Sequence, residues 1–196
     1  MGLLYFFNMA QNNIRELLLN HPIVPVVKIE SLSEVIPCIN DLISKNIHCI
    51  EITLRTKCAI DAIKKAKKHF GNQFAVGVGT VINKTQIRAV IDANVDFIVL
   101  PGVFPELKEP LEKSNIPFLP GVMTASEIMQ GASYGWNTFK LFPANLVGGI
   151  NGIKTFAKVF PEIKFCPTGG VNKQNYLEFL AEESVISVGG SWLVKR

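Results

Sequence analysis

Short β-branched runs alternate along this chain with segments of helical periodicity, and the alternation repeats eight times. Most of the runs are continuously apolar, which is typical of parallel strands that are buried on both faces. Eight strand–helix units in 196 residues predict an α/β fold, a (β/α)8 TIM barrel preceded by an N-terminal helix, with a doubly wound sheet as the alternative. The strands are expected at residues 23–29, 49–55, 74–81, 97–101, 117–123, 138–143, 164–167 and 185–188.

Several segments between the strands carry signals that begin helices. Ser31 with Glu34, and Thr124 with Glu127, have the spacing of a capping box, in which the two side chains satisfy each other's backbone N–H groups. Only residues 192–196 follow the eighth strand and its glycine loop at 189–191, so the eighth helix is expected to be missing or truncated. Two further N-caps are expected at Asn83 and Asn172. The helices are expected at residues 12–20, 32–45, 59–70, 84–93, 126–131, 150–160 and 174–183.

Composition narrows the class of protein further. A hydrophobic content of 48% with 18% charged residues is typical of one compact domain, expected here over residues 1–196, with 1–8 interpreted as a flexible or non-native extension. The net charge is +4, and much of the lysine lies in one run, Lys64, Lys65, Lys67 and Lys68, which is interpreted as the solvated face of a helix. We therefore expect neither nucleic acid nor a membrane as a partner.

The four cysteines form no CxxC pair and no Cys/His metal spacing, and most of them lie in apolar runs. A reducing compartment is expected, and the short apolar N-terminus lacks the features of a cleaved signal, so the location is expected to be cytoplasmic. No metal and no cofactor is expected. The cysteines are Cys38, Cys49, Cys58 and Cys166.

Charged residues interrupt two of the apolar strands. Period-two geometry places Glu51, Thr53 and Arg55 on one face of the second strand, pointing into the barrel. Lys140 lies in the middle of the sixth strand, where burial favours the neutral amine, a nucleophile that can form a Schiff base with a ketone. Two structural alternatives stay open: a buried ion pair that only fixes the strand, and a lysine satisfied by a carboxylate such as Glu51. Lys28, the other strand lysine, lies near a strand end and is easier to solvate.

Glycine-rich loops follow the last two strands. The segments 168–170 and 189–191 read Thr-Gly-Gly and Gly-Gly-Ser, at the two positions where barrels frequently bind phosphate through backbone N–H groups. The run 77–80, Gly-Val-Gly-Thr, lacks the spacing of a dinucleotide-binding motif. It is interpreted as close backbone packing that offers Thr80 to the pocket.

Five motifs occur together in order: Glu-Ile-Thr-Leu-Arg-Thr at 51–56, Gly-Val-Gly-Thr at 77–80, Phe-Lys-Leu-Phe-Pro-Ala at 139–144, Cys-Pro-Thr-Gly-Gly at 166–170 and Gly-Gly-Ser-Trp-Leu at 189–193. From about residue 21 onward the chain resembles the 2-dehydro-3-deoxy-6-phosphogluconate (KDPG) aldolases, which also act as 4-hydroxy-2-oxoglutarate (KHG) aldolases. The resemblance implies Lys140 as the Schiff-base lysine, Glu51 as the proton shuttle, and Arg55 with Thr80 as the carboxylate site. It places the substrate hydroxyls and phosphate at Pro101, Thr168, Gly169, Gly170, Gly190 and Ser191.

The resemblance also implies the reaction, a metal-free lyase step of carbohydrate metabolism in the Entner–Doudoroff pathway. KDPG is cleaved to pyruvate and glyceraldehyde 3-phosphate, and KHG to pyruvate and glyoxylate. A homotrimer is implied as the assembly. Two departures from the family pattern are Asn145, where an acidic residue is usual, and the absence of the last helix. The alternatives are a phosphosugar-binding barrel with impaired catalysis, and a phosphosugar isomerase or synthase on the same scaffold.

Overall fold

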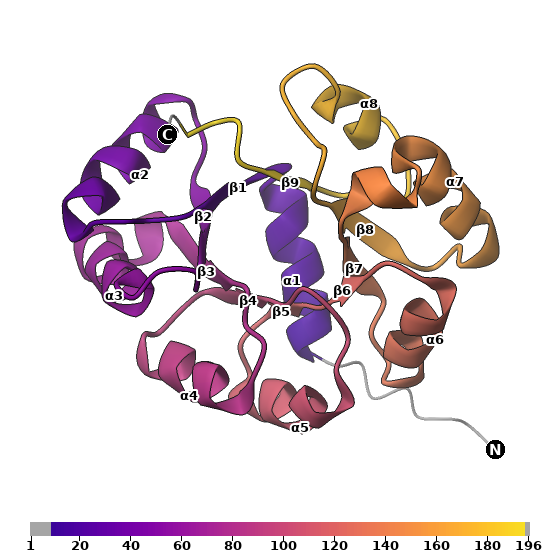
Figure 1. Cartoon of the computed structure of the whole chain (residues 1–196), viewed down its shortest axis with the longest axis horizontal. Helices are drawn as coiled ribbons and strands as arrows, with labels where there is room; N and C mark the ends of the chain where they lie inside the picture. The colour runs from indigo at the N-terminus through magenta and orange to yellow at the C-terminus, as the bar shows by residue number, and fades with distance from the viewer. Residues whose placement is uncertain (1–8, 195–196) are drawn as a thin grey trace.

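The structure, a computed structural model, describes residues 9–194, without the side chains of Met9 and Asn12. Parallel strands alternate with helices along the described chain (Figure 1), which confirms the predicted α/β class. The strands are β1 (Ile23–Val27), β2 (Cys49–Thr53), β3 (Ala75–Gly79), β4 (Phe97–Val99), β5 (Phe118–Leu119), β6 (Gly121–Val122), β7 (Thr138–Leu141), β8 (Lys164–Pro167) and β9 (Val188–Gly190). The helices are α1 (Met9–Asn20), α2 (Val35–Ser44), α3 (Ala59–Phe70), α4 (Lys84–Asp92), α5 (Pro105–Ser114), α6 (Ala125–Ser133), α7 (Gly149–Val159) and α8 (Tyr176–Leu180), with 3-10 turns at Leu32–Glu34, Gly71–Gln73 and Ala144–Val147.

The strands form a curled parallel sheet in two hydrogen-bonded parts. Six strands run in the order β5-β4-β3-β2-β1-β9, and three in the order β6-β7-β8. The two parts meet at two places. Only Pro120 separates β5 from β6. Near β8 and β9, isolated bridges join Phe165 to Val185 and Thr168 to Gly189. The fifth predicted strand is therefore two short ones. The last begins at Val188, because Val185 makes only the isolated bridge.

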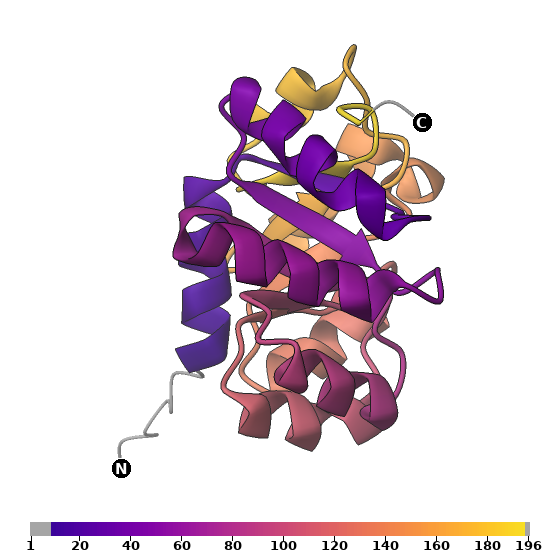
Figure 2. The ribbon, with the colours of Figure 1, turned by 90° about the vertical axis from the view of Figure 1, so that its left-hand side faces the viewer.

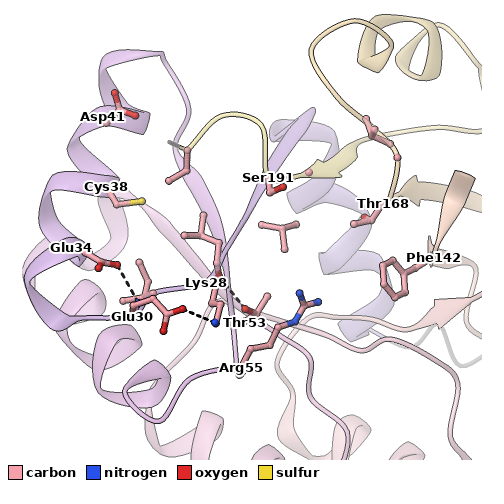
Figure 3. A pocket seen from close by; sticks show the side chains of 18 of the residues that line it. Lys28, Glu30, Glu34, Cys38, Asp41, Thr53, Arg55, Phe142, Thr168 and Ser191 are labelled. Carbon is pink, nitrogen blue, oxygen red and sulfur yellow. Dashed lines mark hydrogen bonds and ion pairs between the residues drawn. The ribbon is translucent and has the colours of Figure 1, made fainter. Parts of the chain in front are cut away.

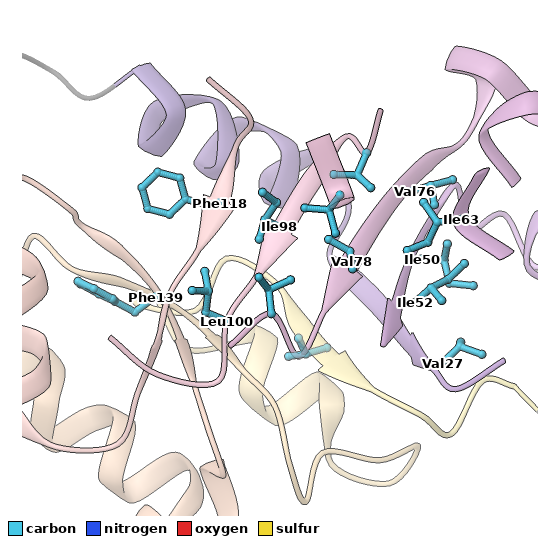
Figure 4. Close-up of a cluster of buried hydrophobic side chains, with 14 of the residues drawn as sticks. Val27, Ile50, Ile52, Ile63, Val76, Val78, Ile98, Leu100, Phe118 and Phe139 are labelled. Atoms are coloured by element: carbon cyan, nitrogen blue, oxygen red, sulfur yellow. The ribbon is translucent and has the colours of Figure 1, made fainter. Parts of the chain in front are cut away.

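Apolar side chains on the outer face of the sheet pack under the helices. Ile50 and Ile52 of β2, Val76 and Val78 of β3 and Ile98 of β4 belong to one buried cluster (Figure 4). Burying an aliphatic side chain of this size contributes about 1.5–3 kcal/mol, so this layer is a main source of stability.

Helix α1 lies across the amino-terminal ends of the strands (Figure 2). Its Ile14 and Leu18 are fully buried in a second cluster. The Gln11 side chain donates to the Phe118 carbonyl of β5 at 2.8 Å and accepts from the Thr138 N–H of β7 at 3.3 Å, so it links the two parts of the sheet. The second cluster also contains Val24, Cys49, Phe97, Val99, Leu119 and Cys166.

Four expectations about the helices need correction. Helix α5 was not among the expected helices, because Pro110 removes one of its hydrogen bonds and weakens the helical pattern. Ser31 and Glu34 do not form a capping box, since Glu34 accepts from the Glu30 N–H instead. Asn172 caps a turn ahead of α8, which begins only at Tyr176. Lys67 is not solvated: its side chain is 8% exposed and pairs with Asp96 at 2.7 Å.

Other helix signals are confirmed. The Asn83 side chain accepts from the Gln86 N–H at the start of α4, and Thr124 and Glu127 form the predicted capping box at α6. Within the described residues after β9, 191–194 form a bend and a turn. The expected extension at residues 1–8 lies outside the described residues. In the described part of the chain, no helix is both long enough and apolar enough to cross a membrane.

Candidate active site

The inner face of β2 carries the polar residues that the period-two pattern predicts. Glu51 is 3% exposed and Thr53 is 1% exposed, while Ile50 and Ile52 face the helices. The Thr53 hydroxyl donates to the Val27 carbonyl of β1 at 3.2 Å. A carboxylate held this deep requires a partner, because an unpaired buried charge is strongly destabilising.

The partner of Glu51 is Lys140. The Lys140 Nζ lies 3.5 Å from the Glu51 Oε1, and the two side chains are 7% and 4% exposed. The Lys140 Nζ also lies 5.0 Å from the centre of the Phe142 ring, two residues further along the same face. Strands β2 and β7 belong to different parts of the sheet, so its curvature brings together residues 89 positions apart.

A glycine in β3 makes room for the Glu51 side chain. A Cβ atom at Gly79 would overlap the Glu51 carboxylate, and one at Gly77 would overlap the Phe97 ring. Glu51 pairs with Gly77 and Thr53 with Gly79 in the strand register, and of the two glycines it is Gly79 whose missing side chain leaves room for the carboxylate. Any larger residue at Gly79 would push Glu51 away from its present position.

Arg55 and Thr80 lie together at the carboxyl ends of β2 and β3. The Arg55 Nε donates to the Thr80 Oγ1 at 3.3 Å. Thr80 has a φ of +63°, a left-handed conformation that is uncommon for a β-branched residue. Strained backbone of this kind is common at functional sites, where the placement of a side chain is maintained at a cost in stability.

A cavity of about 840 Å³ opens at the carboxyl ends of the strands (Figure 3). Figure 3 shows Lys28, Thr53 and Arg55 on the side formed by β1 and β2, with Thr168 and Phe142 on the other side. Thr53 and Phe142 follow Glu51 and Lys140 by two residues, so the ion pair lies one layer below the cavity wall. The wall consists of Val26, Val27, Lys28, Ile29, Glu30, Glu34, Pro37, Cys38, Asp41, Thr53, Arg55, Phe142, Thr168, Gly169, Gly170, Val171, Gly190, Ser191 and Val194.

The two predicted glycine loops meet in this wall. Gly169 and Gly170 have φ values of +91° and +80°, which only glycine adopts without strain. The Asn145 N–H donates to the Gly169 carbonyl at 3.1 Å, and the Cβ of Asn145 leaves no room for a side chain at Gly170. A Cβ atom at Gly190 would overlap the Trp192 ring. The backbone of Gly190 lines the same wall.

Six of the ten predicted site residues lie on the wall itself: Arg55, Thr168, Gly169, Gly170, Gly190 and Ser191. Glu51 and Lys140 lie beneath the wall as an ion pair. Thr80 is not on the wall, but its hydroxyl accepts a hydrogen bond from Arg55. Pro101 lines a separate cavity of about 330 Å³ together with Phe104, and its expected place in the substrate pocket stays a prediction. Phe142 and Lys28 are among the wall residues that were not assigned to the site from the sequence. Phe142 follows Lys140 by two residues and Lys28 follows Val26 by two residues, so strand periodicity could have placed both on the inner face.

The buried thiols are not nucleophiles at neutral pH. Burial raises the pKa of Cys166, the β8 neighbour of Lys140, to about 12, and the nearby Lys140 ammonium opposes this only partly. Burial also raises the pKa of Cys49 to about 12. Cys49 and Cys166 are therefore not candidates for the nucleophile, and Lys140 stays the predicted one. No group of three or more His, Cys, Asp or Glu side chains within residues 9–194 is placed to hold a metal ion.

Comparison with known proteins identifies the family to which this chain is similar. The sequence model of the "KDPG and KHG aldolase" family matches residues 14–196. The KHG/KDPG aldolase of Escherichia coli K12 is 38% identical over 184 residues, which cover 94% of this chain and 86% of that protein. A 2-dehydro-3-deoxy-phosphogluconate aldolase of Pseudoalteromonas atlantica is 40% identical over 172 residues, covering 88% and 80%.

Solved structures agree with the sequence comparison. The KDPG aldolase of Legionella pneumophila, with pyruvate captured as a covalent carbinolamine intermediate, superposes with a TM-score of 0.90 at 41% identity, over 93% of this chain and 88% of that one. The enzyme of Zymomonas mobilis with 3-phosphoglycerate has a TM-score of 0.90 at 34% identity, over 94% and 88%.

Proposed function

This chain belongs to the KDPG and KHG aldolase family and is a lyase, and we propose that Lys140 is the amine that forms its Schiff base. The observation that carries the proposal is a buried amine 3.5 Å from a buried carboxylate, one layer beneath a cavity of about 840 Å³. A related enzyme holds pyruvate as a covalent carbinolamine, the adduct of an amine with a ketone. The activity is cleavage of KDPG to pyruvate and glyceraldehyde 3-phosphate.

The chemistry follows from the two buried groups. The Lys140 Nζ adds to the C2 ketone and loses water, which gives a positively charged iminium. Glu51 accepts the proton of the C4 hydroxyl, the C3–C4 bond breaks, and its electron pair moves to the iminium to form an enamine. The aldehyde leaves, C3 is protonated, and water hydrolyses the imine to release pyruvate and the free lysine. The iminium supplies the positive charge that draws the electrons.

The wall residues divide between the two ends of the substrate. Arg55, oriented by Thr80, binds the carboxylate next to the ketone, because its guanidinium reaches the cavity directly above Glu51. Thr168 lies near the substrate hydroxyls, and Pro101 is assigned there from the family pattern alone. The phosphate is bound by the backbone N–H groups and hydroxyl of the two loops, at Gly169, Gly170, Gly190 and Ser191.

A second substrate is 4-hydroxy-2-oxoglutarate, which would yield pyruvate and glyoxylate. The matched family and the relative in Escherichia coli carry both substrates in their names. The two substrates share the carboxylate, the C2 ketone and the C4 hydroxyl, which are the groups that Arg55, Lys140 and Glu51 contact in this scheme. Cleavage of 4-hydroxy-2-oxoglutarate therefore requires no catalytic residue beyond those proposed for KDPG.

The finer features of the fold and assembly are part of the same proposal. We infer that the two parts of the sheet, joined at Pro120 and at the bridge from Thr168 to Gly189, act as one closed (β/α)8 barrel. We also propose the homotrimer that the family resemblance implies, with the exposed apolar side chains of Ile82, Phe104 and Met129 as candidate contacts between subunits. The cytoplasmic location stays a prediction from the sequence.

The proposal is tested by measuring pyruvate release from KDPG by the whole chain and by Lys140→Met. We expect turnover by the unaltered chain and none by the variant, with both showing the same far-UV circular dichroism and unfolding cooperativity. Binding of KDPG without pyruvate release by the unaltered chain would establish the alternative, a phosphosugar-binding barrel with impaired catalysis. Equal turnover by Lys140→Met would refute the role of Lys140.

A further inference from the structure

Lys28 lines the substrate cavity, and no step of the reaction above uses it. The register of β1 with β2 pairs Val26 with Glu51 and Val27 with Ile52, so Lys28 continues it beside Thr53. Parallel neighbours in register point to the same face, which directs Lys28 into the cavity with Thr53. Figure 3 shows the Lys28 amine close to the Thr53 side of the wall.

The position of β1 places Lys28 between the two anionic ends of the substrate. In the sheet, β1 lies between β2, which leads to Arg55, and β9, which leads to Gly190 and Ser191. Pro25 pairs with Gly190, the residue at which the phosphate loop begins. Lys28 lies three residues after Pro25, further toward the carboxyl end of the strand. A flexible four-carbon side chain at this position can reach an anion held over that loop.

Counting charges indicates what Lys28 binds. The basic residues among those that line the cavity, all within the described part of the chain, are Lys28 and Arg55. KDPG brings a carboxylate and a phosphate that is close to a dianion at neutral pH. With Arg55 on the carboxylate, the glycine loops offer the phosphate neutral N–H groups, and Lys28 is the remaining cation on the wall.

We propose that Lys28 binds the phosphate of the substrate and is a specificity-determining residue for phosphorylated over unphosphorylated sugar acids. The inference rests on the aldolase activity proposed above and deepens it. In the structure the Lys28 Nζ is paired with Glu30 at 2.5 Å, and the two side chains are 51% and 60% exposed. An exposed pair of this kind contributes at most about 1 kcal/mol, so a phosphate dianion can displace the Glu30 carboxylate.

The test compares Lys28→Met with Lys113→Met. Lys113 forms a similar exposed pair with Glu109 at 2.6 Å, on α5. The substrates are KDPG and the same sugar acid without its phosphate. For Lys28→Met we expect kcat/KM on KDPG to fall about 10- to 100-fold, mainly through KM, because a hydrogen bond to a charged group is lost. The rate on the unphosphorylated compound should change less than about threefold, and Lys113→Met should behave as the unaltered chain.

Glu30→Gln gives a test in the opposite direction. Removing the competing carboxylate should lower the KM for KDPG and strengthen inhibition by inorganic phosphate, with no change on the unphosphorylated compound. The proposal is overturned if Lys28→Met leaves KDPG cleavage unchanged, or if it reduces cleavage of both compounds by the same factor. Failure of the aldolase activity itself would show differently, as no pyruvate release from the unaltered chain.

Discussion

Glu51 and Lys140 are tolerated in the interior because each supplies the opposite charge that the other requires. Their separation of 3.5 Å is longer than that of a strong charge-assisted hydrogen bond, so the pair is not arranged for the greatest possible attraction. A buried pair is also weak evidence for stability, because desolvation of both ions offsets their attraction. The geometry fits a proton acceptor beside an amine that must leave its partner to react.

Replacing Glu51 by Gln tests the role of the carboxylate. The variant keeps the shape of the side chain and removes its basicity, so we expect kcat for KDPG cleavage to fall about 10²- to 10⁴-fold. Lys140 should still react with pyruvate, since imine formation uses the amine. The measurement is steady-state pyruvate release alongside borohydride trapping, with the exposed Glu162→Gln as control. Full activity in Glu51→Gln would assign the proton transfer to another group.

His21, just before β1, makes stability depend on pH. Burial lowers its pKa from 6.5, and repulsion from His48 lowers it further. As pH falls below about 6.5, the unfolded chain takes up a proton that the folded chain refuses, so the free energy of unfolding decreases. We expect His21→Gln to lose less stability than the unaltered chain between pH 6.5 and pH 5.5, measured by urea denaturation. Parallel losses in the two proteins would be inconsistent with this role.

Single residues were predictable from the sequence where they broke a strong pattern. Lys140 and Glu51 interrupt apolar strands, and the structure places them together. Lys67 was assigned to a solvated face, because its partner Asp96 lies 29 positions away and no local pattern shows the pairing. Pro101 lines a second cavity, and its role at the substrate, which came from the family resemblance, stays a prediction.

At the scale of elements, helix α6 depends on its capping box. The Thr124 hydroxyl accepts from the Glu127 N–H at 3.3 Å, and the Glu127 carboxylate accepts from the Thr124 N–H at 2.8 Å. We expect Thr124→Ala to lower the free energy of unfolding by about 0.5–2 kcal/mol. Thr124→Ser, which keeps the acceptor, should stay close to the unaltered value in chemical denaturation. Equal losses in both variants would mean that the hydroxyl contributes nothing.

Elements were predictable in type but less so in extent. The predicted 59–70 helix and 164–167 strand match α3 and β8 to the residue, because apolar periodicity and boundary residues agree there. Helix α5 was missed because Pro110 contradicts the helical pattern, and packing of Leu107 and Leu111 against the core overrides it. The break of the fifth strand at Pro120 arises from tertiary curvature, which no local pattern encodes.

At the scale of the whole molecule, α1 closes one end of the sheet while the site occupies the other. Ile14 is fully buried, in a cluster whose other members come from β1, β2, β4, β5 and β8 as well as α1. We expect Ile14→Ala to lower the free energy of unfolding by about 2–5 kcal/mol, because it opens a cavity between α1 and the strands. Leu19→Ala, on the exposed side of the same helix, is the matched control. A similar loss in both variants, measured by urea denaturation, would mean that α1 does not close this end.

The central claim is that Lys140, carried to Glu51 by the curvature of the sheet, is the amine that reacts with the substrate ketone. Its most direct test is reduction of the protein with borohydride in the presence of pyruvate, followed by peptide mapping by mass spectrometry. The account predicts one reduced pyruvyl group per chain, attached to Lys140, and none in Lys140→Met. The absence of an adduct, or an adduct on a different lysine, would contradict it.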